Sequence, residues 1–475
     1  FFGLVLWEMS SPRLRRQKKM SPSNSLPGGG SPWGPSIPAK DDSYWAQVYK
    51  YYAQNSSIAV ANVMEWYEFT AFGFMEAEIS QLFFSHSTVM TWFAFGATFI
   101  ARPIGGLSLG YVADHWGRRP ALLLSLWGMT AATTLQGLTP TVRYLGPAWM
   151  LTCRIVQGLA TGGEIASLTN YLAESSPAQI KAIATSLVGQ GCCLGIGVSC
   201  AVSMFLRRVL RAEQMLKWGW RVPFLAISIP AIIALYGAHE IEETETFTEL
   251  QQDNDVRPSF ATELVSVMQE WKSGLLCISG MASMVSSCFL AGLYLRDWLI
   301  IQSHLNFTTA SMILITMQVA STGVSFAAGY MGDTVGLVKT NMIHSGATCF
   351  AAIPTMAAVY YCPTSPLVLP GLWVVTTFSN GMSSTVYLWC AGLFPADIRG
   401  LALSFYYNLG ACIGGFAPMV CAALSGTTVL VPAYYTAVAS FVSFTALGTS
   451  LAMNKMEEAG EKKSLAVNHL GLAQF

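Results

Sequence analysis

Long apolar stretches separated by short polar loops recur along the whole chain. Each stretch has about 20 residues, the length that a helix needs to cross the hydrocarbon core of a bilayer. The pattern predicts an all-α fold with twelve membrane-spanning helices, near residues 56–80, 88–112, 120–139, 147–171, 182–206, 220–239, 274–296, 309–331, 338–361, 367–393, 400–423 and 430–452.

A charged segment separates the first six spans from the last six. Its acidic sequence predicts a polar linker with one surface helix. The residues before the first span are rich in Ser, Pro and Gly, which predicts a disordered tail. We therefore expect five regions: a tail at 1–52, an N-terminal six-helix half at 53–240, the linker at 241–272, a C-terminal six-helix half at 273–452 and a second tail at 453–475.

Two internal repeats indicate that the halves are copies of one unit. The segment 110–117 after the second span resembles 329–336 after the eighth, 219 residues later. The segment 177–186 resembles 395–404, 218 residues later. A duplicated unit that faces its copy encloses a binding cavity near the membrane midplane, which is the plan of a transporter. We expect each half to consist of inverted three-helix repeats.

The composition excludes a soluble protein and argues against several partners. Only 11% of residues are charged and 53% are hydrophobic, against roughly 25% charged in soluble domains. The net charge of zero gives no basic field for nucleic acid. The eleven cysteines lie in or beside apolar runs, without the spacing of a disulfide scaffold or zinc site. We expect a monomer in a lipid bilayer, without a cofactor or bound metal.

The distribution of Lys and Arg predicts the orientation in the membrane. These residues concentrate in the N-terminal tail and in the loops on the side of both termini, which the positive-inside rule places in the cytosol. The plasma membrane is the expected location. One cluster on the other side does not follow the rule: Arg207, Arg208, Arg211 and Lys217.

Charged residues inside the spans are the strongest chemical signal, because each costs at least about 2.5 kcal/mol at the bilayer centre. The first span carries Glu65, Glu68, Glu76 and Glu78. A helical rotation of 100° per residue places Glu65, Glu68 and Glu76 on one face. We expect Glu65 and Glu68 to line the cavity. For Glu76 and Glu78 the alternative is a position near the outer headgroups, which is favoured for Glu78.

Arg102, Arg154 and Glu164 are further charges within spans. Arg154 and Glu164 lie about 15 Å apart along one helix and cannot pair with each other. We expect a span-one glutamate to be the partner of Arg154. A pair that breaks when its carboxylate is protonated couples a proton to a change of conformation. The predicted proton-coupling residues are therefore Glu65, Glu68, Arg154 and Glu164.

Several motifs resemble those of known transporters. GYVADHWGRRP and RIVQGLATGGEIAS resemble motifs of the major facilitator superfamily. ANVMEWYEFTAFGF, RPIGG, GWRVPF, EETETF and FPADIRGLALSFYYNLG together resemble the metabolite:proton symporter family, which includes proline/betaine, α-ketoglutarate, citrate and shikimate permeases. The resemblance covers residues 56–452 and implies proton-driven uptake of a small polar metabolite.

The resemblance also implies a substrate site. It places Arg102 of RPIGG on a cavity-lining helix, where a guanidinium binds a substrate carboxylate, and Arg221 matches an arginine of the family. The expected substrate site comprises Arg102, Arg221, Glu68, Tyr407 and Asn408. Two alternatives stay open: Arg102 is neutralised permanently by a glutamate, and Arg221 is an anchor at the membrane interface.

The loop after the second span predicts a conformational latch formed by Asp114, Gly117, Arg118 and Arg119. The resemblance suggests that Asp114 faces the positive N-terminus of the eleventh span. The alternative is that the two arginines only anchor the loop on the cytosolic side. The second copy keeps Asp333 but lacks the basic pair, so we expect its latch to be weaker.

The sequence thus predicts a secondary active transporter rather than an enzyme, because no set of catalytic residues converges near an interface. The expected activity is proton symport, by alternating access, of an organic acid or a zwitterionic osmolyte such as proline or betaine. The alternative on the same fold is an uncoupled facilitator or a nutrient sensor.

Overall fold

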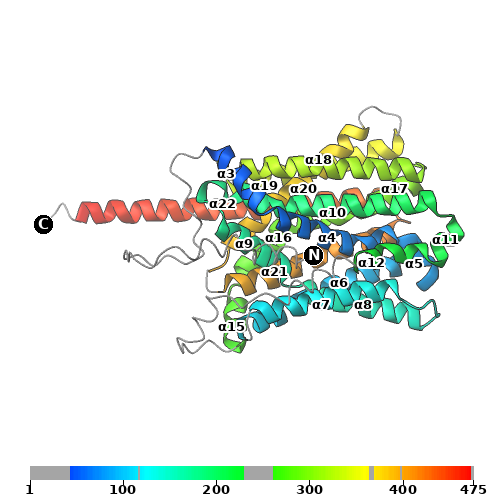
Figure 1. Ribbon diagram of the computed structural model, residues 1–475. Helices are drawn as coiled ribbons and strands as arrows, with labels where there is room; N and C mark the ends of the chain where they lie inside the picture. The colour runs from blue at the N-terminus through cyan, green and yellow to red at the C-terminus, as the bar shows by residue number, and fades with distance from the viewer. Residues whose placement is uncertain (1–42, 116–117, 229–259, 363–367, 396–397, 472–475) are drawn as a thin grey trace.

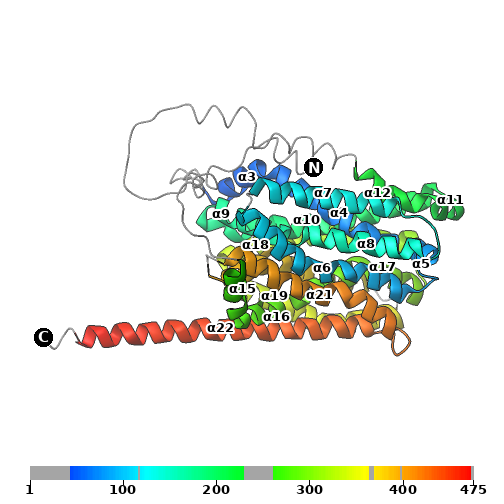
Figure 2. The ribbon, with the colours of Figure 1, turned by 90° about the horizontal axis from the view of Figure 1, so that it is seen from below.

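The computed structural model describes residues 43–115, 118–228, 260–362, 368–395 and 398–471, and their side chains except at 57, 113–115, 118–123, 126 and 454–471. The described residues form helices and connecting turns, with no strand among them. The long helices run back and forth along one axis, as Figures 1 and 2 show.

The first half contains five long helical passages and the start of a sixth. Its helices are α4 (Ser56–Phe74) with α5 (Glu76–Phe83), α6 (Thr88–His115), α7 (Arg118–Gly137), α8 (Leu145–Thr161) with α9 (Glu164–Ser175), α10 (Lys181–Val209), α11 (Ala212–Lys217) and α12 (Val222–Ala226), with the short 3₁₀ turns η1 (Ala178–Ile180) and η2 (Gly219–Arg221). The first five predicted spans match these helices. The sixth begins at α12, and its remainder lies outside the described residues.

The second half follows the same plan. Its helices are α15 (Phe260–Gln269), α16 (Trp271–Phe289), the π-helical segment η3 (Leu290–Tyr294), α17 (Leu295–Gln302), α18 (Phe307–Thr334), α19 (Leu337–Tyr361), α20 (Val368–Gly392), α21 (Arg399–Leu424) and α22 (Val431–Gly471). The helix α15 matches the surface helix predicted for the linker. In the described part of the chain, six segments are long and apolar enough to cross a membrane: 178–209, 271–302, 307–334, 337–361, 399–424 and 431–453.

An additional helix, α3 (Tyr44–Gln54), lies within the segment predicted to be a disordered tail. The boundary of that tail was therefore placed too late. The helix is rich in aromatic residues, and Trp45 stacks on Phe326 and Tyr330 of α18. Val48 and Tyr51 are buried. These apolar contacts order the segment, although its neighbourhood in the sequence is polar.

The two halves pack against each other through α10 with α18 and through α6 with α21. Within the first half, Gly158 and Gly162 let α8 approach the backbone of α6 closely. A Cβ atom at Gly158 would collide with the carbonyl of Thr98, and one at Gly162 with the carbonyl of Arg102. These two glycines therefore also determine how closely α8 approaches Arg102.

The bundle has two distinct ends in Figures 1 and 2. The helices α3, α9 and α15 lie at one end, from which α22 projects; we call it the terminal end. The helices α5, α11 and α17 lie at the other, which we call the opposite end.

Candidate functional site

A small cavity lies inside the first half. The residues that line it come from α4, α6, α7 and α8: Glu65, Trp66, Phe69, Arg102, Met129, Gln157 and Thr161. Two of the predicted site residues, Glu65 and Arg102, thus share one cavity. The sequence placed the cavity between the halves, whereas all residues that line this one belong to the first half.

Arg102 supplies the cation of the cavity. Its side chain is only 4% exposed, and Nη2 donates a hydrogen bond of 3.4 Å to the carbonyl of Thr161. Its guanidinium lies 5.8 Å from the ring centres of both Phe69 and Phe99. The Nε of Arg102 has no hydrogen-bond partner. The group therefore keeps a donor that a bound carboxylate can use.

Two carboxyl groups lie close to Arg102. Glu65 belongs to α4, and Glu164 begins α9, directly after the break between α8 and α9. Their side chains interact with each other, and both are within electrostatic reach of Arg102. Among the described residues, no carboxylate lies within ion-pair distance of Arg102. The structure thus brings Glu65, Glu164 and Arg102 close together, and neither of these two acids forms a salt bridge with Arg102.

Glu68 begins a chain of hydrogen bonds that ends at Arg154. Thr133 donates to Glu68 Oε2 at 3.1 Å and accepts from Gln157 Nε2 at 3.3 Å. Gln157 Oε1 in turn accepts from Arg154 Nη1 at 2.8 Å. The relay therefore connects a carboxylate on α4 to a guanidinium on α8 through one side chain of α7. Neither Thr133 nor Gln157 was among the predicted site residues, although Gln157 lies in the motif RIVQGLATGGEIAS.

Arg154 does not pair directly with a span-one glutamate, contrary to the prediction. It is fully buried, and its guanidinium lies 4.6 to 5.2 Å from the ring centres of Phe69, Phe72 and Phe95. Nη2 also donates to the carbonyl of Phe95 at 3.4 Å. Aromatic faces and neutral acceptors stabilise the cation in place of a carboxylate, and Thr133 bonds to Glu68 instead.

Two residues expected at the substrate site, Tyr407 and Asn408, lie in the second half at its contact with the first. Asn408 Nδ2 donates to the carbonyl of Gly162 at 2.6 Å, and Ser404 Oγ donates to the same carbonyl at 3.0 Å. Tyr407 packs edge-on against Tyr387 and is within electrostatic reach of Arg102. Asn408 therefore joins the two halves, and it does not line the cavity.

Arg221 lies away from the cavity. Its Nη1 donates to the carbonyls of Gly137 and Thr139 at 2.7 and 2.9 Å, and the guanidinium lies 4.4 Å from the ring centre of Trp220. The carbonyls at the end of α7 lack helical partners, and a cation there also complements the helix dipole. The structure does not bring Arg221 to the predicted substrate site.

The contact expected of Asp114 is seen at its copy, Asp333. Asp333 accepts hydrogen bonds from the backbone N–H groups of Ala182 and Ile183, at 2.7 and 3.0 Å. These groups lie in the first turn of α10, where partial positive charge favours a carboxylate. The predicted latch residue Gly117 and the side chains of Asp114, Arg118 and Arg119 lie outside the described residues.

The helix α3 adds a third donor to this latch. The hydroxyl of Tyr44 donates to Asp333 Oδ2 at 2.9 Å. Partial burial, followed by the neighbouring Asp333 carboxylate, raises the pKa of Tyr44 above its ordinary value. The hydroxyl therefore stays protonated at neutral pH and keeps donating.

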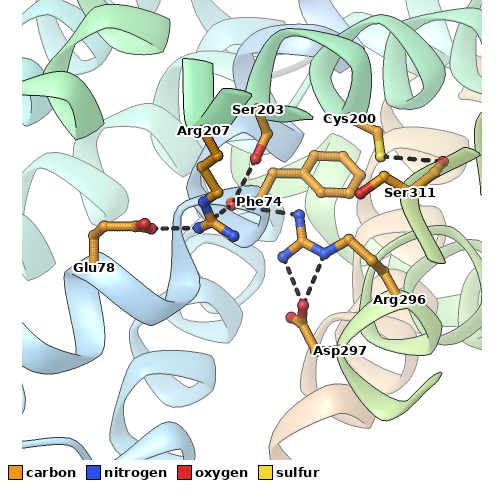
Figure 3. Close-up of polar contacts among 8 residues, drawn as sticks. All are labelled: Phe74, Glu78, Cys200, Ser203, Arg207, Arg296, Asp297 and Ser311. Carbon is orange, nitrogen blue, oxygen red and sulfur yellow. Dashed lines mark hydrogen bonds and ion pairs between the residues drawn. The ribbon is translucent and has the colours of Figure 1, made fainter. Parts of the chain in front are cut away.

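A second polar network joins the halves at the opposite end, and Figure 3 shows it. The carbonyl of Phe74, at the end of α4, accepts hydrogen bonds from Ser203, Arg207 and Arg296 at 3.2, 3.3 and 3.5 Å. Arg207 also forms an ion pair with Glu78. Ser203 and Arg207 belong to the first half and Arg296 to the second, so one carbonyl connects both halves.

This network accounts for residues that the sequence left unexplained. Arg207 of the basic cluster and Glu78 of the first span are partners. Sequence analysis missed Arg296, which is 1% exposed and bonds to Asp297. The sequence does show Arg296 and Asp297 together in an otherwise apolar run. They fall at the predicted end of a span, where charged residues are common.

Comparisons with known proteins identify similar chains. A model of the Major Facilitator Superfamily matches residues 58–419. The glycine betaine/proline/ectoine/pipecolic acid transporter OusA of Dickeya dadantii (strain 3937) is 27% identical over 397 residues, which cover 80% of this chain and 79% of that protein. The proline/betaine transporter of Escherichia coli (strain K12) is 26% identical over 406 residues, 82% of this chain and 81% of that one.

Solved structures show the same fold. The proton:xylose symporter XylE, bound to 6-bromo-6-deoxy-D-glucose, superposes with a TM-score of 0.65 at 16% identity, covering 85% of this chain and 95% of that one. A structure of the partially occluded, inward-open xylose transporter XylE from E. coli gives a TM-score of 0.62 at 15% identity, covering 84% and 98%. At this identity the likeness concerns the fold alone.

Proposed function

This chain belongs to the Major Facilitator Superfamily, and from that premise we propose that it moves a small polar metabolite together with protons by alternating access. Membership makes it an integral, multi-pass membrane transporter and not an enzyme. It also implies twelve transmembrane helices in two six-helix halves, which is the fold that the sequence predicts.

The observation that carries the proposal is the charge arrangement at the cavity. Two carboxyl groups, those of Glu65 and Glu164, surround one guanidinium, that of Arg102. Buried charges are stable when they are balanced, so a second positive charge is required whenever both carboxyl groups ionise. A proton on one of them meets this need, because one carboxylate and one guanidinium then remain, and these can bind the ammonium group and the carboxylate of a zwitterion.

The Glu68 relay gives a route from protonation to conformational change. An ionised Glu68 only accepts hydrogen bonds, whereas a protonated Glu68 has one O–H to donate. Donation to Thr133 would end the hydrogen bond that Thr133 now donates to Glu68, so the Thr133 hydroxyl would turn and reorient the hydrogen bond that it accepts from Gln157. The change then reaches Arg154 through Gln157, and so moves α8 relative to α4 and α7.

A zwitterion of the proline/betaine type is the substrate class that the charged and aromatic side chains around this cavity match best. Arg102 offers donors for a carboxylate, while Glu65, with the aromatic faces of Trp66 and Phe69, suits a quaternary or secondary ammonium group. Both charges lie in one small cavity, which is less suited to a molecule with two or three carboxylates. The relatives named proline/betaine transporters support the same class.

Contacts between the halves at both ends support alternating access. At the terminal end, Asp333 bonds to the start of α10; at the opposite end, Arg296 bonds to Phe74. A solute can pass only when one set breaks while the other holds. We place both termini in the cytosol of a cell bounded by the plasma membrane, and the pairing of Arg207 with Glu78 removes one exception to the positive-inside rule.

Uptake by the purified protein in proteoliposomes tests the proposal. Labelled proline, glycine betaine, α-ketoglutarate and citrate are supplied with and without an inward proton gradient. We expect proline or glycine betaine to accumulate above equilibrium only when the gradient is present. Equal uptake under both conditions would indicate a facilitator, and binding without flux would indicate a sensor; either result contradicts the proposal.

A further inference from the structure

The helix α21 of the second half reaches backbone carbonyls beside the cavity. All residues that line the cavity belong to the first half, although alternating access requires the second half to affect it. The helix α21 packs along α6 and against α9 (Figure 2). Three of its side chains, spaced four residues apart and so on one face, hydrogen-bond to carbonyls of the first half: Ser404, Asn408 and Cys412. We call these three residues the α21 face.

The first of these carbonyls belongs to Gly162, at the break between α8 and α9. Carbonyls at the end of a helix lack donors from their own helix. Asn408 Nδ2 and Ser404 Oγ supply the missing donors, at 2.6 and 3.0 Å. Asn408 is fully buried and Ser404 is 4% exposed, so both hydrogen bonds are shielded from water. The position of this turn therefore depends on α21.

The second carbonyl belongs to Phe99 on α6. Its helical donor would be the N–H of residue 103, but that residue is Pro103, which has no N–H. Cys412 Sγ lies 3.3 Å from this carbonyl oxygen. It also lies 3.4 Å from the carbonyl of Asn408 in its own helix. The carbonyl of Phe99 lacks a helical donor, so it gains more from the single proton of the thiol.

Both carbonyls lie beside Arg102, the cation of the cavity. Phe99 precedes it by three residues on α6, and the ring centre of Phe99 lies 5.8 Å from the guanidinium. The carbonyl of Thr161, the residue before Gly162, accepts the hydrogen bond from Arg102 Nη2. A shift of either the Phe99 segment or the turn at Gly162 would therefore move a group that holds the guanidinium in place.

We propose that the α21 face positions Arg102 for the carboxylate of the substrate, and that it does so only while the halves are in contact at this point. The proposal rests on the proposed function and adds positioning residues outside the cavity. The helix α9, against which α21 packs, lies at the terminal end. When that end opens, α21 moves away and both carbonyls lose their donors. The guanidinium then loses its fixed orientation, and its affinity for the carboxylate falls, which favours release of the substrate at the terminal end.

The alternative is that the α21 face only holds the helices together. The three helices do approach closely here, since a Cβ atom at Gly106 of α6 would collide with Ser404 Oγ and would lie 3.1 Å from the carbonyl of Gly162. A purely structural contact would stabilise the joined halves whichever side chain stands at position 102. The two roles therefore differ in whether the effect of α21 depends on Arg102.

The first measurement is the affinity of the full chain, in lipid nanodiscs, for labelled glycine betaine and proline, by scintillation proximity. Asn408→Ala should weaken the affinity about tenfold when Arg102 is present. In an Arg102→Lys background the same substitution should weaken it by less than about twofold, because the two residues act as one unit. A structural contact would instead give the same factor in both backgrounds.

Asn380→Ala is the matched control for this measurement. It makes the same substitution at another buried asparagine of the second half, whose amide donates to Gln318 and Ser321 within that half. It should leave the affinity unchanged. A loss as large as that in Asn408→Ala would indicate a general packing defect and would contradict the proposal.

The second measurement needs no substrate. Phenylglyoxal, a neutral reagent for guanidinium groups, is added to the nanodiscs, and mass spectrometry of the peptides gives the rate of modification at each arginine. Asn408→Ala should raise the rate at Arg102 about tenfold. The rate at Arg154, whose hydrogen bonds are to Gln157 and Phe95, should stay the same. Ser404→Ala should raise the rate at Arg102 by a smaller factor, which keeps the test usable if Asn408→Ala folds poorly.

Two further results would overturn the proposal. One is an unchanged rate of modification at Arg102 in both Asn408→Ala and Ser404→Ala. The other is an equal loss of affinity from Asn408→Ala with and without Arg102→Lys. If the native chain binds neither glycine betaine nor proline, the proposed substrate class is wrong, and the rate of modification at Arg102 alone decides whether the α21 face positions this guanidinium.

Discussion

The interiors of the two halves share a fold but differ in chemistry. In the first half, buried polar positions carry Arg102, Arg154 and Glu68. In the second half, the corresponding network is neutral: Asn380 Nδ2 donates to Gln318 Oε1 at 3.2 Å and to Ser321 Oγ at 3.2 Å. His344 hydrogen-bonds to the carbonyl of Phe378 at 2.7 Å.

The difference indicates where proton chemistry takes place. Amide and hydroxyl groups hold helices together or bind a polar solute, but they do not gain or lose a charge near neutral pH. Carboxyl groups do. Duplication therefore supplied two similar scaffolds, and the ionisable groups near the cavity lie in the first. Proton coupling should therefore depend on the first half and tolerate changes in the neutral network of the second.

The largest effect is expected from Glu68→Gln. The amide keeps the shape of the acid but has no proton to release, so gradient-driven accumulation should fall to the equilibrium level while exchange of substrate continues. Uptake and counterflow in proteoliposomes measure the two activities separately. Gln318→Ala in the second half is the control variant, and it should retain uphill accumulation. Normal accumulation by Glu68→Gln would show that Glu68 does not take part in the mechanism.

Thr133→Val should have the next largest effect, because it removes the link between Glu68 and Gln157 without changing charge or shape greatly. Loss of a buried hydrogen bond of this kind costs about 1 to 3 kcal/mol, so we expect the accumulation ratio to fall about tenfold. Thr385→Val breaks an analogous hydroxyl contact in the second half, with Asn341 at 2.6 Å. Equal losses of accumulation in Thr133→Val and Thr385→Val would indicate a general packing defect. That result would contradict the difference between the two halves.

Arg102→Lys separates a substrate contact from a structural one. Lysine keeps the charge but lacks the fork that binds a carboxylate through two hydrogen bonds. We expect the apparent affinity for substrate to weaken about tenfold at normal surface expression. Unaltered affinity would indicate that Arg102 has a structural role only. This is the alternative, stated above, in which a glutamate neutralises Arg102 permanently.

The smallest effects are expected at the terminal-end latch. Asp333→Asn removes the charge at the start of α10, an interaction worth up to about 2 kcal/mol when partly buried. Tyr44→Phe removes one donor to the same carboxylate, worth about 1 kcal/mol. Reactivity of a cysteine engineered at a buried position of the terminal end should rise in both variants, more in Asp333→Asn. Unchanged labelling in Asp333→Asn would contradict the latch.

The sequence predicted the fold well because membrane spans follow from local hydrophobicity. It located ten spans to within a few residues at both ends, and it located the start of α22, which continues as a helix beyond the predicted span to Gly471. The predicted fold class is confirmed by the family match. It also selected Glu65, Arg102 and Glu164, because a charge inside an apolar run is visible without any structure.

The partners of these charges could not be read from the sequence. The relay residue Thr133 is an ordinary hydroxyl in a helix, and only the packing of α7 against α8 gives it a role. Arg221 and Asn408 were assigned to the substrate site by resemblance, whereas their hydrogen bonds depend on backbone carbonyls, which no residue pattern records. Arg154 was expected to need a carboxylate, but three aromatic rings surround it.

Proton movement caused by the substrate tests the central claim most directly. Proteoliposomes loaded with a pH-sensitive dye, initially at equal pH on both sides, receive proline or glycine betaine outside. The account predicts that the lumen acidifies as the substrate enters, and that Glu68→Gln abolishes the acidification while Gln318→Ala retains it. Substrate entry without acidification in the protein with its native Glu68 would contradict proton coupling through the first half.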